Sequence, residues 1–292
     1  MRSEKEMFDL ILDFAKENPL IRAVYMNGSR ANPNAKRDIF QDYDIVYVVT
    51  EVSPFVDKKS WLCRFGEICV MQEPDATALP YEKTNLEVGY TYLMQFEDGN
   101  RIDLTFRSIP AALQEYPADS LTLLLLDKDG LMPVLPSPTD SDYHVRKPDV
   151  AVFSSCCNEF WWVSPYIAKG LWRNEILFAL DHLESCIRRM LRMMLGWEAG
   201  ARNGFAISTG KCDKTLEPYL PADTWTRLLN TYPHAETDAV WDALFASCCL
   251  FHDTAAYVAE SLGYAYNLEE ERRTTAFLQD VRNLPKDAVT IR

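Results

Sequence analysis

The spacing of hydrophobic residues in the first half of the chain predicts one amphipathic helix followed by several short strands. Ser3 and Glu6 have the spacing of a capping box, and apolar residues recur at helical intervals after them until Asn18-Pro19. Runs of β-branched, aliphatic and aromatic residues then predict strands. The predicted strands are 21–26, 44–49, 68–71, 88–96, 101–106 and 121–126, and a further helix is predicted at 110–116.

Two of these strands, 88–96 and 101–106, form a predicted hairpin. Asp98-Gly99 lies between them, and Asp-Gly between two strand-like runs is a strong signal for a tight turn. In the second strand, apolar residues alternate with polar ones, and Asp103 is one of the polar residues. Because successive side chains of a strand point to opposite faces, Asp103 is expected on the face opposite the core side chains.

The second half of the chain has a helical pattern instead. Pro, Ser and Asp are frequent between Met132 and Asp149, which indicates a linker. Segments with helical spacing follow at 158–171, 174–197, 222–232, 237–262 and 269–278. The sequence therefore predicts an α+β fold. It consists of an N-terminal domain of strands and helices at 1–135, a linker at 136–149, and an all-α helical bundle at 150–292.

The composition favours a folded protein whose partners are not polyanions. Of the 292 residues, 48% are hydrophobic and 12% aromatic, which is enough for a full core and excludes global disorder. A net charge of −13 and a pI of about 4.8 disfavour binding to nucleic acid or to an anionic membrane surface. The same charge suits a cationic small-molecule ligand.

The sequence predicts neither a secretion signal nor a membrane span. The segment MRSEKEMFDL lacks the apolar core of a signal peptide. The longest aliphatic run, 121–126, is far too short to span a bilayer. The eight cysteines include no CxxC pair, so reduced thiols are expected rather than a zinc site or a disulfide framework. Together these features predict a cytoplasmic protein.

Two carboxylates mark the start of the second predicted strand. Asp42 and Asp44 are separated by one residue, so both side chains are expected on the same face. Like charges that close repel each other unless a cation lies between them, and Mg²⁺ prefers such oxygen ligands together with substrate phosphates. Asp103 on a neighbouring strand would complete a site for two metal ions. Such a pair stabilises the attacking and leaving oxygens of a phosphoryl displacement.

A glycine-serine pair precedes these carboxylates and is suited to a phosphate ligand. Gly28 follows the first predicted strand, where a glycine lets the backbone approach a ligand closely. The Ser29 hydroxyl and the N–H groups after it are suitable donors to phosphate oxygens. Arg30 is able either to neutralise phosphate charge or to pair with a nearby carboxylate.

The glycine-serine pair, the two spaced aspartates and the distant third aspartate together resemble the signature of the nucleotidyltransferase (polymerase β-like) superfamily. The longer string NGSRANPNAKRDIFQDYDIVYVV is similar to the aminoglycoside 6-adenylyltransferases, also called streptomycin adenylyltransferases. The similarity continues in LLLLDKDG at Leu123–Gly130, in AKGLWRNEILFALDH at Ala168–His182, and around Ser208–Lys211. It therefore extends over nearly the whole chain.

The resemblance implies an N-terminal domain that holds MgATP on a mixed β-sheet flanked by helices, and a helical domain that helps to hold the drug. The implied reaction transfers AMP from ATP to the 6-hydroxyl of streptomycin, releases pyrophosphate and confers antibiotic resistance. Asp42, Asp44 and Asp103 would hold two Mg²⁺ ions. Gly28, Ser29, Arg30 and Lys211 would contact the nucleotide.

The attacking hydroxyl must lose a proton, so a general base is expected within hydrogen-bond reach of it. The match to the family's segment indicates Asp181 as this base and as a substrate contact. Glu184 is a second substrate-binding candidate, and Glu184 and Glu175 are reserve candidates for the base. On a helical wheel Asp181 falls at the edge of an apolar stripe. The stripe consists of Leu177, Leu180, Ile187 and Leu191.

Each of these assignments competes with a simpler one. The two spaced aspartates also suit a solvated turn before a strand, and Asp103 suits an ordinary exposed strand position. Asp181 is within helical reach of Arg188 and so also suits a surface ion pair.

Two other functions compete with streptomycin adenylylation. One is nucleotide transfer to a different hydroxylated small molecule, such as another aminoglycoside or a lincosamide. The other is a nucleotide-binding partner protein without turnover. The presence of all three carboxylates and of a whole helical domain disfavours this last role, and no obligate protein partner is expected.

Overall fold

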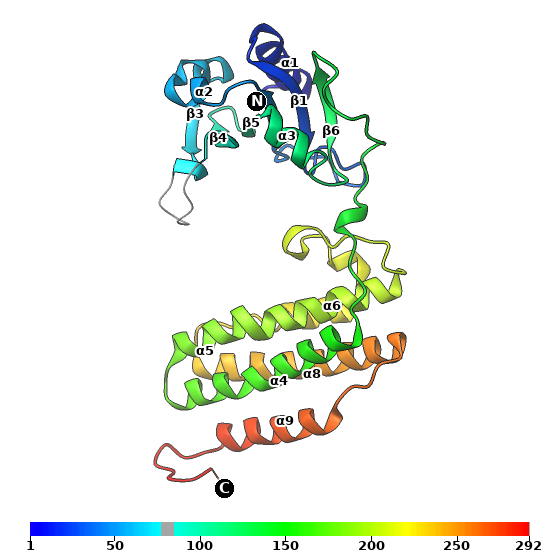
Figure 1. Ribbon diagram of the computed structural model, residues 1–292. Helices are drawn as coiled ribbons and strands as arrows, with labels where there is room; N and C mark the ends of the chain where they lie inside the picture. The colour runs from blue at the N-terminus through cyan, green and yellow to red at the C-terminus, as the bar shows by residue number, and fades with distance from the viewer. Residues whose placement is uncertain (77–84, 292) are drawn as a thin grey trace. The chain divides into compact units, whose positions relative to one another are not determined.

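The computed structural model describes residues 1–76 and 85–291 and divides into two compact units, Met1–Asp142 and Tyr143–Arg292 (Figure 1). Each unit has its own hydrophobic core. The N-terminal unit contains a β-sheet with helices on both faces, and the C-terminal unit is helical. These features confirm the predicted α+β class.

The N-terminal unit is built on a six-stranded mixed sheet with the order β3-β4-β5-β2-β1-β6. The strands are β1 Ile21–Asn27, β2 Tyr43–Val49, β3 Ile68–Gln72, β4 Gly89–Phe96, β5 Arg101–Ser108 and β6 Leu123–Asp127. Neighbouring strands are antiparallel except β2 and β5, which run parallel. The predicted hairpin is confirmed, because β4 pairs with β5 across the Asp98-Gly99 turn.

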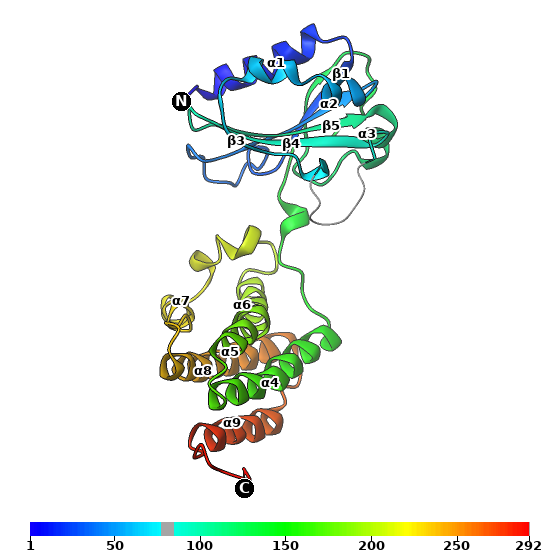
Figure 2. The same ribbon diagram turned by 90° about the vertical axis from the view of Figure 1, so that its left-hand side faces the viewer.

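Helices cover both faces of this sheet (Figure 2). The predicted capping box of α1, Glu4–Glu17, is present: the Ser3 hydroxyl accepts from the Glu6 backbone, and the Glu6 carboxylate accepts from the Ser3 backbone. The apolar stripe of α1 packs on one face of the sheet together with α2, Ser53–Asp57, and a 3₁₀ helix at Lys59–Phe65. On the other face, α3, Ile109–Glu115, contributes Ala112 to a smaller core.

The C-terminal unit packs its helices around one core rich in aromatic residues. Its helices are α4 Val150–Trp172, α5 Ile176–His182, a π-helical segment Leu183–Arg188, α6 Arg189–Arg202, α7 Ala222–Leu229, α8 Thr237–Leu262 and α9 Leu268–Arg282. Phe160 of α4 stacks on Phe251 of α8 with ring centroids 3.8 Å apart. No helix within the described ranges is long and apolar enough to cross a membrane.

Two predicted helix boundaries were wrong. The helix predicted to begin at residue 158 begins at Val150, because the Asp149 carboxylate accepts from the Val152 N–H and caps the first turn. The helix predicted over 174–197 begins at Ile176, extends to Arg202 and contains a π-helical segment. Asn174 has a left-handed φ of 61°, which separates α4 from α5, and the π-helical segment then separates α5 from α6.

Candidate active site

The parallel register of β2 and β5 brings the predicted aspartates together. Asp44 lies directly opposite Asp103 in this pairing, and on its other side Asp44 is opposite Asn27 of β1. Asp42 precedes β2 by one residue. Carboxylates that lie far apart in the sequence therefore meet at one end of the two central strands.

Strand alternation puts these carboxylates on one face. Tyr43 and Ile45 of β2, and Ile102 and Leu104 of β5, are almost fully buried in the core beneath α1. The residues between them therefore point to the opposite face. The prediction that Asp103 lies on that face is confirmed by the alternating burial of β5.

Arg101 shares this face with the aspartates and contacts two of them. Its Nε and Nη2 donate to the two oxygens of Asp103 at 2.8 and 2.9 Å. Its Nε also lies 3.6 Å from Oδ2 of Asp42. The hydrogen bonds to Asp103 raise the pKa of the Arg101 guanidinium, and the charges of Asp42 and Asp44 raise it further. One cation thus lies within the field of all three carboxylates.

Gly28 lies against Asp44 in a way that excludes any side chain. Its φ is +75°, a conformation that favours glycine. A Cβ at this position would lie 2.2 Å from Oδ2 of Asp44. The loop after it is held by a hydrogen bond from the Gln41 side chain to the Ser29 carbonyl, at 3.3 Å. The backbone of the glycine-serine pair is therefore in direct contact with the carboxylate site.

Arg30 is 8% exposed and contacts the protein itself. Its guanidinium lies over the Tyr43 ring at 3.8 Å, and its Nη2 donates to the Gln41 carbonyl at 2.8 Å. Glu4 is 3.6 Å from its Nη1. These contacts match the ion-pair alternative for Arg30, and a phosphate contact from it stays a prediction.

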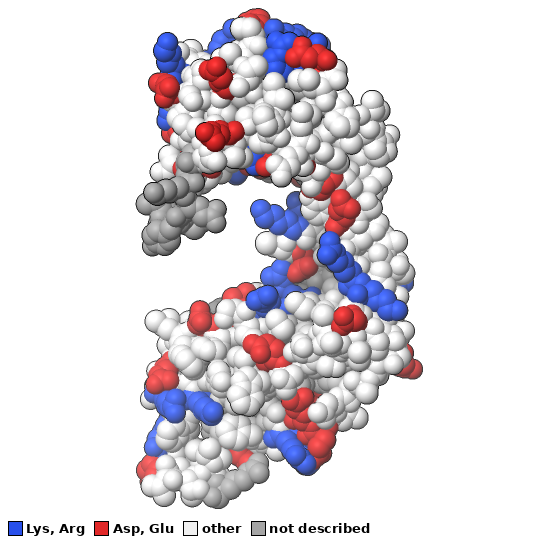
Figure 3. All heavy atoms as spheres, viewed as in Figure 1, with Lys and Arg blue, Asp and Glu red and all other residues white. Residues whose placement is uncertain are grey.

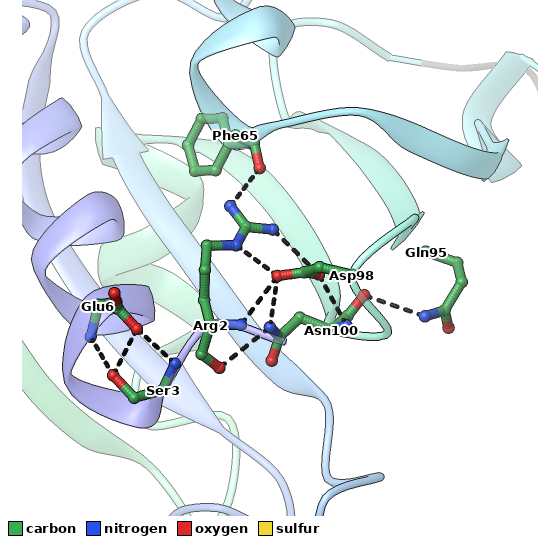
Figure 4. A network of polar contacts seen from close by, with 7 residues as sticks. All are labelled: Arg2, Ser3, Glu6, Phe65, Gln95, Asp98 and Asn100. Carbon is green, nitrogen blue, oxygen red and sulfur yellow. Dashed lines mark hydrogen bonds and ion pairs between the residues drawn. The ribbon is translucent and has the colours of Figure 1, made fainter.

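The start of β5 is fixed by a polar network that links the N-terminus to the β4–β5 turn (Figure 4). Arg2 donates from its backbone N and its Nε to Oδ2 of Asp98, at 3.0 and 2.7 Å. Asn100, which is buried, donates from Nδ2 to the Arg2 carbonyl and from its backbone N to Oδ1 of Asp98. Arg101 is the next residue after this network, so its backbone is held in place.

The donor set is suitable for Mg²⁺, because three carboxylates converge on one face beside a glycine turn. Within the described ranges, no group of three or more His, Cys, Asp or Glu side chains is arranged to hold a metal ion. At the sheet site, the guanidinium of Arg101 contacts Asp103 and lies beside Asp42. Arg101 therefore places one positive charge among the carboxylates.

The helical unit contains a cavity of about 400 Å³. It is lined by Val145, Glu184, Arg189, Arg192, Met193, Gly196, Trp197, Thr209 and Asp213. Arg192 donates from Nε to Asp213 at 2.8 Å, and the Thr209 hydroxyl donates to the other oxygen of that carboxylate at 3.0 Å. Charges of both signs therefore surround this cavity. On the face shown in Figure 3, acidic and basic side chains are likewise interspersed over each unit.

The predicted residues of the helical unit lie in different surroundings. Glu184 lines the cavity and accepts from Nε of the buried Arg188. Lys211 is exposed between two lining residues, Thr209 and Asp213.

Asp181 and Glu175 are both exposed. The apolar stripe beside Asp181 was predicted wrongly in one respect, because Leu177 is 79% exposed. The turn at Asn174 and the short helix after it direct that side chain to solvent.

Two features of these sites were missed by sequence reasoning. Arg101 alternates with Asp103 along one strand, which was a usable signal for their proximity. The arginines of the cavity, Arg189 and Arg192, had no comparable signal, because the π-helical segment before them changes which residues share a face.

Comparison with known proteins gives a consistent result. The sequence model of the family described as streptomycin adenylyltransferase matches residues 1–281. The aminoglycoside 6-adenylyltransferase of Campylobacter jejuni is 41% identical over 272 residues, which is 93% of each chain. The enzyme of that name from Bacillus subtilis (strain 168) is 42% identical over 269 residues, 91% of this chain and 93% of that one.

A crystal structure of an aminoglycoside 6-adenyltransferase from Bacillus subtilis aligns with 97% of this chain and 100% of its own, at 36% identity and a TM-score of 0.49. The family model covers almost the whole chain, and two relatives exceed 40% identity over nine-tenths of it. The chain therefore belongs to the streptomycin adenylyltransferase family.

Proposed function

We propose that the protein transfers AMP from MgATP to the 6-hydroxyl of streptomycin and releases pyrophosphate. The main supporting observation is the convergence of Asp42, Asp44 and Asp103 on one sheet face, against a glycine turn that leaves room for no side chain. Family membership supplies the reaction class and the acceptor. Adenylylation of the drug would confer resistance, and the use of ATP suits an enzyme of the cytoplasm.

The three aspartates would hold Mg²⁺. A bound Mg²⁺ would neutralise charge on the phosphates and on the leaving pyrophosphate, and a pair of ions would act on both the attacking and leaving oxygens. The register of β2 and β5 already aligns Asp44 with Asp103, so little rearrangement of the backbone is needed. The side chain of Arg101 also lies at this site, in contact with Asp103.

The turn at Gly28 would orient the nucleotide. Backbone N–H groups after a glycine with positive φ, together with the Ser29 hydroxyl, are suitable donors to phosphate oxygens. Lys211 of the helical unit would add a positive charge for the phosphates. Arg30 would hold the turn in place through its contacts with the Tyr43 ring and the Gln41 carbonyl.

The acceptor hydroxyl would attack the α-phosphorus, the bond to the β-phosphate oxygen would break, and pyrophosphate would leave. The hydroxyl proton would pass to a carboxylate oxygen of Asp181, acting as general base. Glu184, which lines the cavity of the helical unit, would attract the cationic drug. Its partner Arg188 is buried and also donates to the Thr231 carbonyl. The position of the Glu184 carboxylate is therefore set by a guanidinium that is itself held in place.

The experiment that tests this proposal measures pyrophosphate release from ATP and Mg²⁺ with streptomycin, beside other aminoglycosides and a lincosamide. Mass spectrometry of the products identifies the acceptor. We expect streptomycin-dependent release and a product heavier by one AMP. Release with only another acceptor would keep the reaction and correct the substrate. ATP binding without release for any acceptor would favour the non-catalytic nucleotide-binding protein.

A further inference from the structure

Arg101 occupies an unusual place for a basic residue, because it lies inside a group of carboxylates that the proposed function assigns to a metal. Both oxygens of Asp103 accept from its guanidinium, at 2.8 and 2.9 Å, and Asp42 is 3.6 Å away. A cation at this position offsets part of the repulsion between the carboxylates without any bound ion.

We propose that Arg101 is a resident counter-ion that competes with metal: its guanidinium holds Asp42 and Asp103 together in the nucleotide-free protein and leaves them when metal and nucleotide bind. The inference rests on the proposed function, since it takes the three aspartates as the metal ligands. It adds a role for a residue that the reaction itself does not require.

The position of Arg101 is suited to such an exchange. Its backbone is held by the β4–β5 pairing, in which it is opposite Gln95, and by the Arg2–Asp98–Asn100 network that precedes it (Figure 4). Its side chain is 40% exposed, so the guanidinium is able to rotate into solvent without opening the core. Arg101 thus combines a fixed backbone with a guanidinium that is able to move, as a displaceable counter-ion requires.

The alternative is a permanent contact, in which Arg101 stays on Asp103 and orients it for the metal. The two roles predict opposite effects on metal affinity. A competing cation weakens metal binding, so its removal strengthens it, whereas loss of an orienting residue weakens binding. The sign of the change therefore decides between them.

The test uses Mn²⁺ alone, without nucleotide, and follows the free Mn²⁺ signal by electron paramagnetic resonance. For Arg101→Gln we expect the dissociation constant for Mn²⁺ to fall at least about tenfold, because a positive charge a few ångströms from the ion is removed. An unchanged or higher dissociation constant would overturn the inference. Arg101→Met, which keeps most of the aliphatic chain, repeats the measurement should the first variant fail to fold.

Two controls make the result specific. Arg107→Gln removes a charge of the same sign from the same strand, at a residue that pairs with Glu115, and should leave Mn²⁺ affinity within about twofold at moderate salt. Asp44→Asn tests the proposed metal site itself. If this variant binds Mn²⁺ as tightly as wild type, the metal assignment fails. If it loses Mn²⁺ while Arg101→Gln shows no gain, only the role of Arg101 fails.

Discussion

The sheet site and the cavity of the helical unit differ in what places their side chains. At the sheet site, the parallel register of β2 and β5 puts Asp44 opposite Asp103, and strand alternation fixes the face. Around the cavity, the wide turn at Leu183–Arg188 changes the helical phase between Asp181 and Arg192. The sheet site is thus set by backbone pairing, and the helical site by packing of particular side chains.

This difference leads to an expectation about substitutions. A change at one of the three aspartates would remove a proposed metal ligand that no other side chain replaces, so the loss should be close to complete. In the helical unit, the proposed base Asp181 and the charged residues of the cavity are separate groups, so changing one of them leaves the proposed metal ligands intact and the loss should be smaller. Substitutions in the two units test this contrast, and the largest effect is expected at the sheet site.

Asp44→Asn should abolish turnover. It removes a charge that we propose binds metal, and we expect kcat with ATP, Mg²⁺ and streptomycin to fall at least about 10³-fold. The measurement is pyrophosphate release. Asp57→Asn, an exposed aspartate at the end of α2, is the matched control and should retain wild-type activity. A kcat close to wild type for Asp44→Asn would show that this carboxylate is not a metal ligand.

Asp181→Asn should lower kcat by about 10²–10⁴-fold while ATP binding stays intact, the usual contribution of a general base. Steady-state kinetics with streptomycin separate kcat from KM. Glu175→Gln provides the comparison, because Glu175 is also exposed and lies in the same family segment, Ala168–His182. A change confined to KM would make Asp181 a residue that positions the drug. A loss of kcat in Glu175→Gln but not in Asp181→Asn would identify Glu175 as the general base instead.

Gly28→Ala should disturb the sheet site through the backbone. The new Cβ would lie 2.2 Å from Oδ2 of Asp44, so this carboxylate must move, and a shift of about 1 Å costs on the order of 10² in rate. The left-handed conformation should also cost about 1–2 kcal/mol of unfolding free energy.

Gly130→Ala is the matched control for this change. Gly130 has a similar φ of +65°, and a Cβ there would meet nothing within 4 Å. It should therefore lose similar stability in denaturant titration but keep full activity. Equal activity in the two variants would mean that the contact between Gly28 and Asp44 does not matter for turnover.

Local signals allowed much of the sheet unit to be predicted from the sequence. The capping box at Ser3, the Asp98-Gly99 turn and the face of Asp103 each depend on residues that are close in the chain, and all three are present in the structure. The pairing of β2 with β5 is a contact between distant segments. Alternation within β5 puts Arg101 and Asp103 on one face, but it does not report that Asp42 lies 3.6 Å from Arg101.

The helical unit was predicted less well, for a physical reason. Its helices were recognised from apolar spacing, but that spacing assumes an unbroken helix. The π-helical segment breaks this assumption, and Leu177, which was assigned to one apolar stripe with Ile187 and Leu191, is exposed while they are buried. The cavity depends on the packing of α6 with the loop that contains Asp213, and no periodicity in the sequence reports such packing.

The smallest predicted effect concerns the network that fixes the start of β5. Hydrogen bonds from Arg2 lower the pKa of Asp98 well below its ordinary value of 3.8. A carboxyl whose pKa is lower in the folded protein stabilises the fold above its unfolded pKa, and this contribution is lost as the pH falls below it. Asp98→Asn should therefore cost about 1 kcal/mol of unfolding free energy at pH 6.

The difference between wild type and Asp98→Asn should shrink as the pH is lowered from about 5 towards 3, because wild-type Asp98 then becomes protonated on unfolding. Urea titrations of both proteins at several pH values measure it. Asp57→Asn again serves as the control, because Asp57 is an exposed aspartate outside this network. If the difference in unfolding free energy between wild type and Asp98→Asn does not change with pH, the network stabilises β5 without any contribution from the charge of Asp98. The backbone of Arg101 would then be held by the β4–β5 pairing rather than by the charge on Asp98.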